Sequence, residues 1–180
     1  MQELKNKFRI KAKKFRKTLN NAEKSKKDET IFKKITALKE YENAEVLLCY
    51  VSTENEIDTK RLIDYSLKIG KKIAVPKCFE KNIMKFYYIS SLNDLKTGKF
   101  GILEPNNNAK LCENFENSLC IVPALLVDSD LNRLGYGGGF YDRFLKGYNG
   151  AKCVVCYKEN MVEKLPINSF DVKADLLVTD

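Results

Sequence analysis

The sequence places four glycines within five positions, Gly135-Tyr136-Gly137-Gly138-Gly139, directly before a stretch that can form a helix. Glycine has no Cβ atom, so its backbone can adopt a positive φ and approach a ligand closely. Free N–H groups at the start of a helix, together with the helix dipole, bind anions such as phosphate. The alternative is a flexible turn, but so many glycines would add an entropic cost to a turn without a function. We therefore expect a phosphate-binding loop here.

Two standard phosphate-binding motifs do not describe this loop. No Lys-Ser or Lys-Thr pair follows it, as a P-loop requires. A dinucleotide-binding fingerprint would occur early in the chain and would place its third glycine at position 140, which is Phe140. The chain also contains no histidine, which excludes Ser-His-Asp and Cys-His catalysis and any metal site that needs imidazole. Catalysis must use Lys, Arg, Asp, Glu, Tyr, backbone amides or a carboxylate-bound metal.

The six cysteines do not indicate a zinc or disulfide site. Cys153 and Cys156 form one C-x-x-C, but a structural zinc site needs a second ligand pair, and none has suitable spacing. A redox C-x-x-C usually opens a helix, whereas this pair lies in an apolar run typical of a buried strand. We expect core cysteines that act as small apolar side chains.

Positive charge is concentrated near the N-terminus. Residues 1–40 contain 14 Lys or Arg against 5 Asp or Glu, whereas residues 41–180 contain 18 against 19. Leu4, Phe8, Ala12, Phe15 and Leu19 recur at steps of three and four, which predicts a helix with one apolar stripe and basic surroundings. By itself such a basic face could be merely solvated, or could attract nucleic acid without specificity.

Helical stretches alternate with short apolar runs along the chain. We expect helices at 4–19, 22–38, 58–70 and 140–148, and strands at 44–52, 71–77, 82–90, 119–128, 151–157 and 174–180. The strand, helix and strand over 44–77 have the length of a right-handed parallel unit. The pattern predicts one α/β domain over residues 1–180, with a mostly parallel, open twisted sheet between helices in a Rossmann-like three-layer arrangement, preceded by a basic helix. Such sheets bind ligands at the carboxyl ends of their strands.

The glycine segment resembles the signature of the 5-formyltetrahydrofolate cyclo-ligase family, also called methenyltetrahydrofolate synthetases. That signature, R-L-G-x-G-x-G-[YF]-Y-D, is matched by Arg133, Leu134, Gly135, Gly137, Gly139, Phe140, Tyr141 and Asp142. The family's K-x-x-[LF]-R, G-E-[VI]-D-T and F-G-I-x-E-P motifs are matched in order by residues 5–9, 55–59 and 100–105. Asn55 and Ala124 each replace a usual glycine. The resemblance covers nearly the whole chain.

The resemblance implies an enzyme that closes 5-formyltetrahydrofolate to 5,10-methenyltetrahydrofolate, with ATP and Mg²⁺ and release of ADP and phosphate. Phosphorylation turns the formyl oxygen into a leaving group, N10 attacks the formyl carbon, and phosphate departs. Phosphoryl transfer depends mainly on positioning and charge neutralisation, so it does not need histidine.

The resemblance also implies roles for single residues. The expected catalytic residues are Arg133, Tyr141 and Asp142. ATP is expected to contact Lys5 and Arg9, one helical turn apart, with Arg133, Leu134, Gly135, Tyr136, Gly137, Gly138, Gly139, Phe140 and Tyr141. The folate is expected to contact Val51, Glu56, Phe100, Tyr136, Gly137, Gly138, Gly139, Phe140 and Tyr141, with Tyr50 as a further wall and Glu56 accepting hydrogen bonds from the pterin. Asp142 and, as a weaker second ligand, Asp180 are expected to bind Mg²⁺. Lys13 and Arg16 continue the basic side of the first helix and are expected to assist Lys5 and Arg9.

Two of these carboxylates, and the chain as a whole, also have other interpretations. Asp142 could simply complement a helix dipole, and Glu56 could do the same just before Asp58. The chain could be another nucleotide- or sugar-phosphate-binding α/β enzyme, or a basic RNA-binding protein, although no RNA-binding motif accompanies the lysines. The N-terminal segment lacks the apolar core of a secretory signal, and no apolar run reaches the roughly 20 residues that span a bilayer. We expect a cytoplasmic monomer that binds small molecules, without specific nucleic acid or membrane binding.

Overall fold

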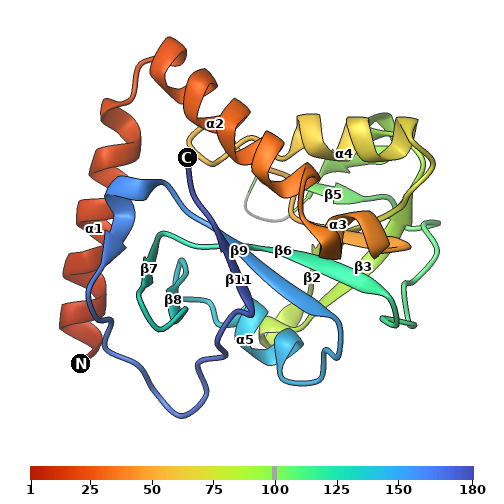
Figure 1. The fold of residues 1–180 in the computed structure, drawn as a ribbon. Coiled ribbons are helices and arrows are strands. Elements are labelled where there is room, and N and C mark those ends of the chain that lie inside the picture. The colour runs from red at the N-terminus through yellow and green to blue at the C-terminus, as the bar shows by residue number, and fades with distance from the viewer. Residues whose placement is uncertain (99–100) are drawn as a thin grey trace.

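A six-stranded sheet forms the centre of the computed structural model, which describes residues 1–98 and 101–180 (Figure 1). The strand order is β11-β9-β6-β1-β2-β3, and every neighbouring pair is parallel except β2 and β3. The strands are β1 (Val46–Cys49), β2 (Lys72–Cys78), β3 (Met84–Ile89), β6 (Ser118–Pro123), β9 (Ala151–Val155) and β11 (Leu176–Val178). The expected mostly parallel sheet is confirmed.

Helices cover both faces of this sheet, because successive side chains of each strand point to opposite faces and both sets are apolar. Leu47 and Ile121 belong to the core shared with α2, α3 and α4, whereas Leu48 and Val122 belong to the core shared with α5. Figure 1 shows the three layers. The helices are α2 (Asn21–Thr36), α3 (Lys39–Asn43), α4 (Lys60–Lys68) and α5 (Phe140–Leu145).

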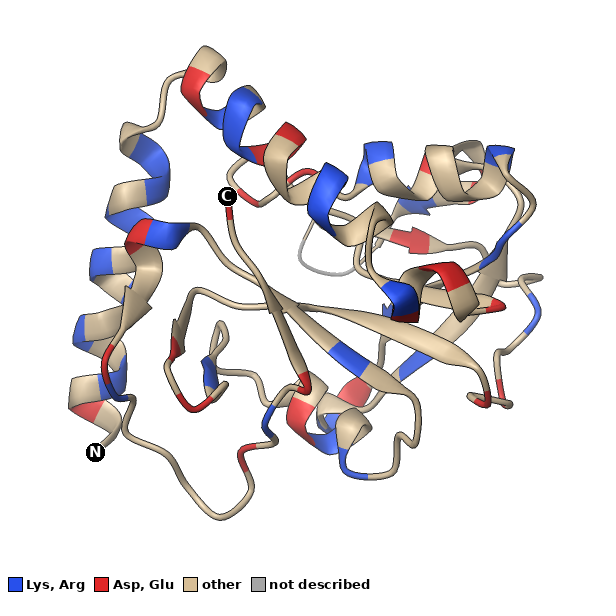
Figure 2. Cartoon of the chain, viewed as in Figure 1, with Lys and Arg blue, Asp and Glu red and all other residues tan. Residues whose placement is uncertain are grey.

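The basic helix α1 (Gln2–Thr18) lies beside a second, three-stranded sheet of order β10-β7-β8. Ala12 packs there with Leu125, Leu126 and Leu134. The strands of this sheet are β7 (Leu126–Asp128), β8 (Arg133–Leu134) and β10 (Met161–Val162). Basic residues lie along α1 and continue into α2, as expected from the charge distribution (Figure 2).

One strand prediction was wrong. Residues 119–128 are not a single central strand, because β6 ends at Pro123 and β7 begins at Leu126 in the second sheet. Proline has no amide hydrogen, so it cannot continue a ladder of hydrogen bonds on both sides. The apolar run hid this break because both halves are buried.

Several short elements were not predicted from the sequence. They are the hairpin strands β4 (Leu95–Thr97) and β5 (Leu103–Pro105), the strands β8 and β10, and the 3-10 helices η1 (Glu80–Asn82), η2 (Leu92–Asp94) and η4 (Lys158–Asn160). They have only two or three residues each, too few to produce a periodic pattern.

All six cysteines are free, and five are buried, which agrees with the expectation of core cysteines. Burial raises the pKa of the Cys153 and Cys156 thiols to about 12 each. Among the described residues, no helix is both long and apolar enough to cross a membrane.

Candidate active site

The glycine loop, residues 135–139, connects β8 to α5. Gly137 and Gly139 have φ values of +107° and +67°, a region that other residues rarely adopt, and Gly139 caps α5. The turn before β8 is held by the buried Asp128 carboxylate, which accepts hydrogen bonds from the amides of Asp130, Asn132 and Leu165. These contacts fix the position from which Arg133 and the glycine loop begin.

Two arginine side chains contact the glycine loop. Arg9 Nε on α1 donates a 2.9 Å hydrogen bond to the carbonyl oxygen of Gly135. A Cβ atom at Gly137 would lie 3.3 Å from Arg9 Cζ, so the guanidinium covers this residue closely. A Cβ at Gly135 would lie 3.4 Å from Arg133 Nη1. The two cations that were expected to bind phosphates thus lie against the same short segment.

Arg133 is buried and forms an ion pair of 2.8 Å with Asp142 at the start of α5. Asp142 Oδ1 also accepts a hydrogen bond of 3.2 Å from the amide of Val172. Arg133 Nε has no hydrogen-bond partner within the described part of the chain. Since a buried guanidinium normally has its donors satisfied, this unused donor favours a polar or anionic ligand at the site.

Lys5 is also buried, and its Nζ lies 2.6 Å from Asp171 Oδ2. Asp171 precedes Val172, whose amide contacts Asp142, so residues 171 and 172 connect the first helix to the start of α5. Asp171 was not predicted from the sequence, because its segment has no pattern that distinguishes it from other polar loops.

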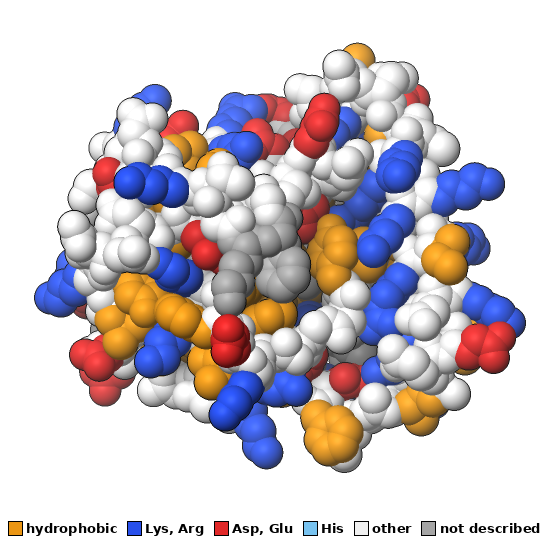
Figure 3. All heavy atoms as spheres, turned by 180° about the vertical axis from the view of Figure 1, so that it is seen from behind, with side chains coloured by type: hydrophobic (Ala, Val, Ile, Leu, Met, Phe, Trp, Pro, Cys, Tyr) orange, Lys and Arg blue, Asp and Glu red, His pale blue; other side chains and the backbone are white. Residues whose placement is uncertain are grey.

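Arg16, which was expected only to assist, is a buried part of this region. Its Nη1 donates a 3.0 Å hydrogen bond to the Tyr136 hydroxyl, and its Nη2 donates a 2.5 Å hydrogen bond to the carbonyl oxygen of Ala124. Lys13 Nζ lies 5.2 Å from the centre of the Tyr136 ring. Arg9, Lys13 and Arg16 of α1 therefore converge on the glycine loop beyond the carboxyl end of β6. Figure 3 shows Lys and Arg side chains gathered on the side of the molecule formed by α1.

Glu56 lies in the loop after β1, and its Oε2 accepts hydrogen bonds of 2.8 Å from the amide and hydroxyl of Thr53. Burial raises the pKa of Tyr50, Tyr136 and Tyr141, and the negative charge of Glu56 adds to each shift. Glu56 is therefore close enough to act on all three phenols, which belong to three different segments. All three tyrosines stay protonated at neutral pH.

Tyr141 combines a buried hydroxyl with a charged neighbour. Its hydroxyl has no hydrogen-bond partner within residues 1–98 and 101–180. The Arg133 Cζ atom lies 5.7 Å from the centre of its ring, within the range of a cation–π contact. A phenol left without a partner beside Glu56 and Arg133 is suited to hydrogen-bond a ligand.

Several residues that were expected to contact ATP or folate have side chains buried in the apolar core. Val51 and Leu134 are buried in apolar clusters, so their side chains serve the core and only their backbone could meet a ligand. Phe140 is partly buried against the core under α5. Phe100 lies outside the described residues.

The structure does not bring Asp180 to Asp142. Asp180 Oδ2 lies 2.6 Å from Lys27 Nζ on α2, and its Oδ1 accepts the Lys158 amide. Burial alone would raise the pKa of Asp180, but these hydrogen bonds and the Lys27 charge outweigh it and lower the pKa. Figure 1 shows the C-terminus beside α2 and away from α5. The contacts of Asp180 account for its charge without a metal.

Comparison with known proteins shows similarity over nearly the whole chain. The model of the 5-formyltetrahydrofolate cyclo-ligase family matches residues 1–180. A probable 5-formyltetrahydrofolate cyclo-ligase of Schizosaccharomyces pombe is 31% identical over 167 residues, which cover 83% of this chain and 82% of that protein. The 5-formyltetrahydrofolate cyclo-ligase of Haemophilus influenzae is 29% identical over 178 residues, 95% of each chain. The solved structure of Aquifex aeolicus 5,10-methenyltetrahydrofolate synthetase is similar with a TM-score of 0.85 and 32% identity, covering 98% of this chain and 89% of the other.

Proposed function

Because this chain belongs to the 5-formyltetrahydrofolate cyclo-ligase family, we propose that it converts 5-formyltetrahydrofolate to 5,10-methenyltetrahydrofolate with ATP as co-substrate. The single observation that carries the mechanism is the contact of Arg9 and Arg133 with the same glycine loop. In this proposal the loop amides and the two guanidinium groups bind the ATP phosphates, with Lys5 beside them. Preorganised cations of this kind stabilise the charge that develops on a transferred phosphoryl group.

The chemistry proceeds in two steps. The formyl oxygen attacks the γ-phosphorus of ATP, the bond from this phosphorus to the β–γ bridging oxygen breaks, and ADP leaves. N10 then attacks the activated formyl carbon, loses its proton, and the carbon–oxygen bond breaks to release phosphate. The protein's part is to align the formyl oxygen with ATP and to neutralise charge, mainly through Arg133 and the loop amides.

The folate side of the proposal rests on Glu56 and Tyr141. The Glu56 carboxylate can accept hydrogen bonds from the amino group and ring N–H of the pterin, since its Oε1 is not used by Thr53. The unpaired hydroxyl of Tyr141 can bond a polar atom of the same substrate. Both side chains lie close enough to interact electrostatically, so one substrate could contact both.

We propose that Asp142 and Asp171 would hold Mg²⁺. Magnesium typically binds one or two carboxylates together with phosphate oxygens and water. The Val172 amide, adjacent to Asp171, donates to Asp142, which favours this pair over Asp180. Within the described residues no cluster of three or more candidate metal ligands occurs, so phosphate and water would complete the coordination. When bound, Mg²⁺ supplies charge neutralisation at the phosphates.

The test is an assay with purified protein, 5-formyltetrahydrofolate, ATP and Mg²⁺, which follows the absorbance of the methenyl product and the release of ADP. We expect one ADP for each product molecule. Arg133→Lys and Asp142→Asn should lower turnover by about 100-fold or more, because they remove transition-state contacts. Lys146→Ala, an exposed change at the end of α5, is the control. Absence of product with the unaltered protein at every pH would overturn the proposal. A cytoplasmic location and a monomeric state stay predictions.

A further inference from the structure

The side chain of Arg143 turns back from α5 onto the end of the glycine loop. Arg143 is exposed, and its Nη1 donates hydrogen bonds of 3.1 Å to the carbonyl oxygen of Gly138 and 3.2 Å to that of Gly139. Helical side chains tilt toward the start of their helix, so a residue four positions after the capping Gly139 can reach it. The proposed function assigns no role to this arginine.

Glycine at position 139 makes this contact possible. Its φ is +67°, and a Cβ atom there would lie 2.8 Å from Arg143 Nη1, closer than real Cβ atoms approach other atoms. The Gly139 carbonyl oxygen also accepts the backbone amide of Arg143 at 3.2 Å. The side chain and the backbone of one residue therefore hold the same carbonyl group, and they join the loop to the helix at this point.

The contact decides which way two backbone amides of the loop point. The peptide bonds of the loop are trans, so the C=O and N–H of each peptide unit point in opposite directions. The Gly138 carbonyl shares its peptide unit with the Gly139 amide, and the Gly139 carbonyl shares its unit with the Phe140 amide. Both carbonyls are directed at Arg143, so both N–H groups are directed away from it. Neither amide donates a hydrogen bond within residues 1–98 and 101–180.

An anion that binds to these two amides needs them to keep this orientation. Glycine tolerates both signs of φ, so a peptide unit between two glycines can turn over at little steric cost. Donors stabilise a phosphate best when they already point at it and need no reorganisation during the reaction. By holding the two carbonyls, Arg143 supplies the orientation that the glycines themselves do not impose.

We propose that Arg143 is a positioning residue, which holds the amides of Gly139 and Phe140 toward the phosphates of ATP. The inference rests on the proposed function and adds to it a residue that acts through the loop backbone. Arg9 and Arg133 would contact the phosphates directly, whereas Arg143 lies on the carbonyl side of the loop. Both of its hydrogen bonds come from one nitrogen atom, so the ammonium group of a lysine can replace them.

The test compares Arg143→Met, which removes the donor, with Arg143→Lys, which keeps one. Arg143→Met should raise the KM for ATP by about tenfold, the size expected when one or two hydrogen bonds to a phosphate lose their orientation. Arg143→Lys should stay within about threefold of the unaltered protein, since an ammonium group can donate to both carbonyls. The KM for 5-formyltetrahydrofolate and the urea midpoint should not change in either variant, because the side chain is exposed. Equilibrium dialysis with ATP should give the same ratios without turnover.

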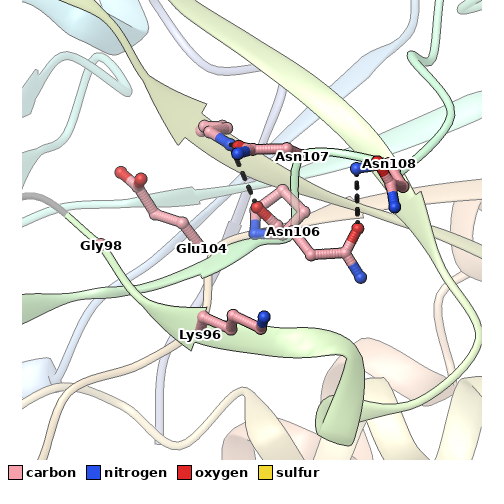
Figure 4. A pocket seen from close by; sticks show the side chains of 8 residues that line it. Lys96, Gly98, Glu104, Asn106, Asn107 and Asn108 are labelled. Carbon is pink, nitrogen blue, oxygen red and sulfur yellow. Dashed lines mark hydrogen bonds between the residues drawn. The ribbon is translucent and has the colours of Figure 1, made fainter.

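Two exposed lysines provide controls that remove the same charge. Lys146 lies three residues after Arg143, at the end of α5, and its side chain makes no hydrogen bond with the described part of the loop. Lys96 lies on β4, where it borders a cavity of about 420 Å³ beside the β4–β5 hairpin (Figure 4). Lys146→Met and Lys96→Met should both leave the KM for ATP unchanged. A rise that the controls share would mean a general attraction of ATP by positive charge and would overturn the role of Arg143.

Two further results would overturn the inference. One is a KM for ATP in Arg143→Met that equals that of the unaltered protein. The other is an equal loss in Arg143→Lys and Arg143→Met, because the donor to the carbonyls would then not be the feature that matters. If the protein binds ATP but forms no product, the proposed reaction fails while the role of Arg143 is still judged by the ratio of ATP affinities.

Discussion

Arg16 Nη1 donates a 3.0 Å hydrogen bond to the Tyr136 hydroxyl and thereby joins α1 to the glycine loop across 120 positions of sequence. Arg16 is buried, so loss of the Tyr136 hydroxyl leaves one of its N–H groups without this acceptor. The contact also orients Tyr136 near Glu56, whose charge raises the pKa of this phenol in addition to burial. We interpret the pair as a contact that holds α1 against the glycine loop, which is the proposed phosphate-binding segment.

A double-mutant cycle measures this coupling. Arg16→Met and Tyr136→Phe should each lower the free energy of unfolding by about 1–3 kcal/mol, whereas the double variant should lose less than their sum by about 1 kcal/mol. Urea denaturation gives the three values. Lys17→Met, on the same helix but exposed, should change stability little. Strict additivity would show that the two side chains do not interact in solution.

Alanine substitutions at Gly137 and Gly147 provide a matched test and control for the glycine loop. Gly137→Ala forces a side chain onto a φ of +107° and places its Cβ 3.3 Å from Arg9 Cζ, so we expect a strain of about 1–3 kcal/mol and a higher KM for ATP. Gly147→Ala meets open space and should leave ATP kinetics unchanged. Thermal denaturation and initial rates measure both effects. Equal KM values for ATP in the two variants would argue against Arg9 and this loop as phosphate contacts.

Glu56→Gln should weaken folate binding selectively. The substitution keeps the size of the side chain but removes the charge that accepts hydrogen bonds from the pterin, so the KM for 5-formyltetrahydrofolate should rise about tenfold. The KM for ATP should stay the same. Glu54→Gln, an exposed change two residues earlier, is the control. A rise in the KM for ATP instead would mean that Glu56 serves the phosphate side.

The choice between Asp171 and Asp180 as the second magnesium ligand is tested by the Mg²⁺ dependence of the rate. Asp171→Asn should shift the half-maximal Mg²⁺ concentration upward by about tenfold or more, because a carboxylate ligand is lost. Asp180→Asn breaks the ion pair with Lys27 and should lower stability while keeping the Mg²⁺ dependence. The opposite result would restore Asp180 to the metal site.

The buried cysteines predict a loss of stability at alkaline pH. Burial raises the pKa of Cys153 and Cys156 to about 12, whereas an unfolded thiol ionises near pH 8.5. A raised folded pKa gives stability that is complete below the unfolded pKa and declines as pH rises above it. The free energy of unfolding, measured in urea, should therefore fall between pH 8 and pH 10, by up to about 1.4 kcal/mol per pH unit for each thiol, and less in Cys153→Ala. A midpoint independent of pH over this range would contradict the burial of these groups.

The sequence predicted the parts of the fold that depend on local pattern. Short, mainly apolar runs such as 44–52 predicted buried strands, and the spacing of Leu4, Phe8 and Ala12 predicted α1, because both patterns follow directly from backbone geometry. The break at Pro123 and the second sheet were missed, since an apolar run does not reveal which of two sheets its halves join.

The candidate site was predictable only in part. The glycine loop and its neighbours form a continuous motif, so residues 133–142 could be assigned from sequence. The pairs Lys5–Asp171 and Arg16–Tyr136 join positions that are 166 and 120 apart, and no local pattern encodes such contacts. Asp180 was expected as a weaker second magnesium ligand because the last strand of the family closes with an acidic residue, but its carboxylate contacts Lys27 on α2 instead.

The contact between Lys5 and Asp171 has a consequence for folding. The two residues are 166 positions apart, so their ion pair closes a very long loop of the chain. The entropy of closing such a loop is lost before a contact of this separation can form. The ion pair therefore favours the docking of α1 only after the chain between the two residues has become compact.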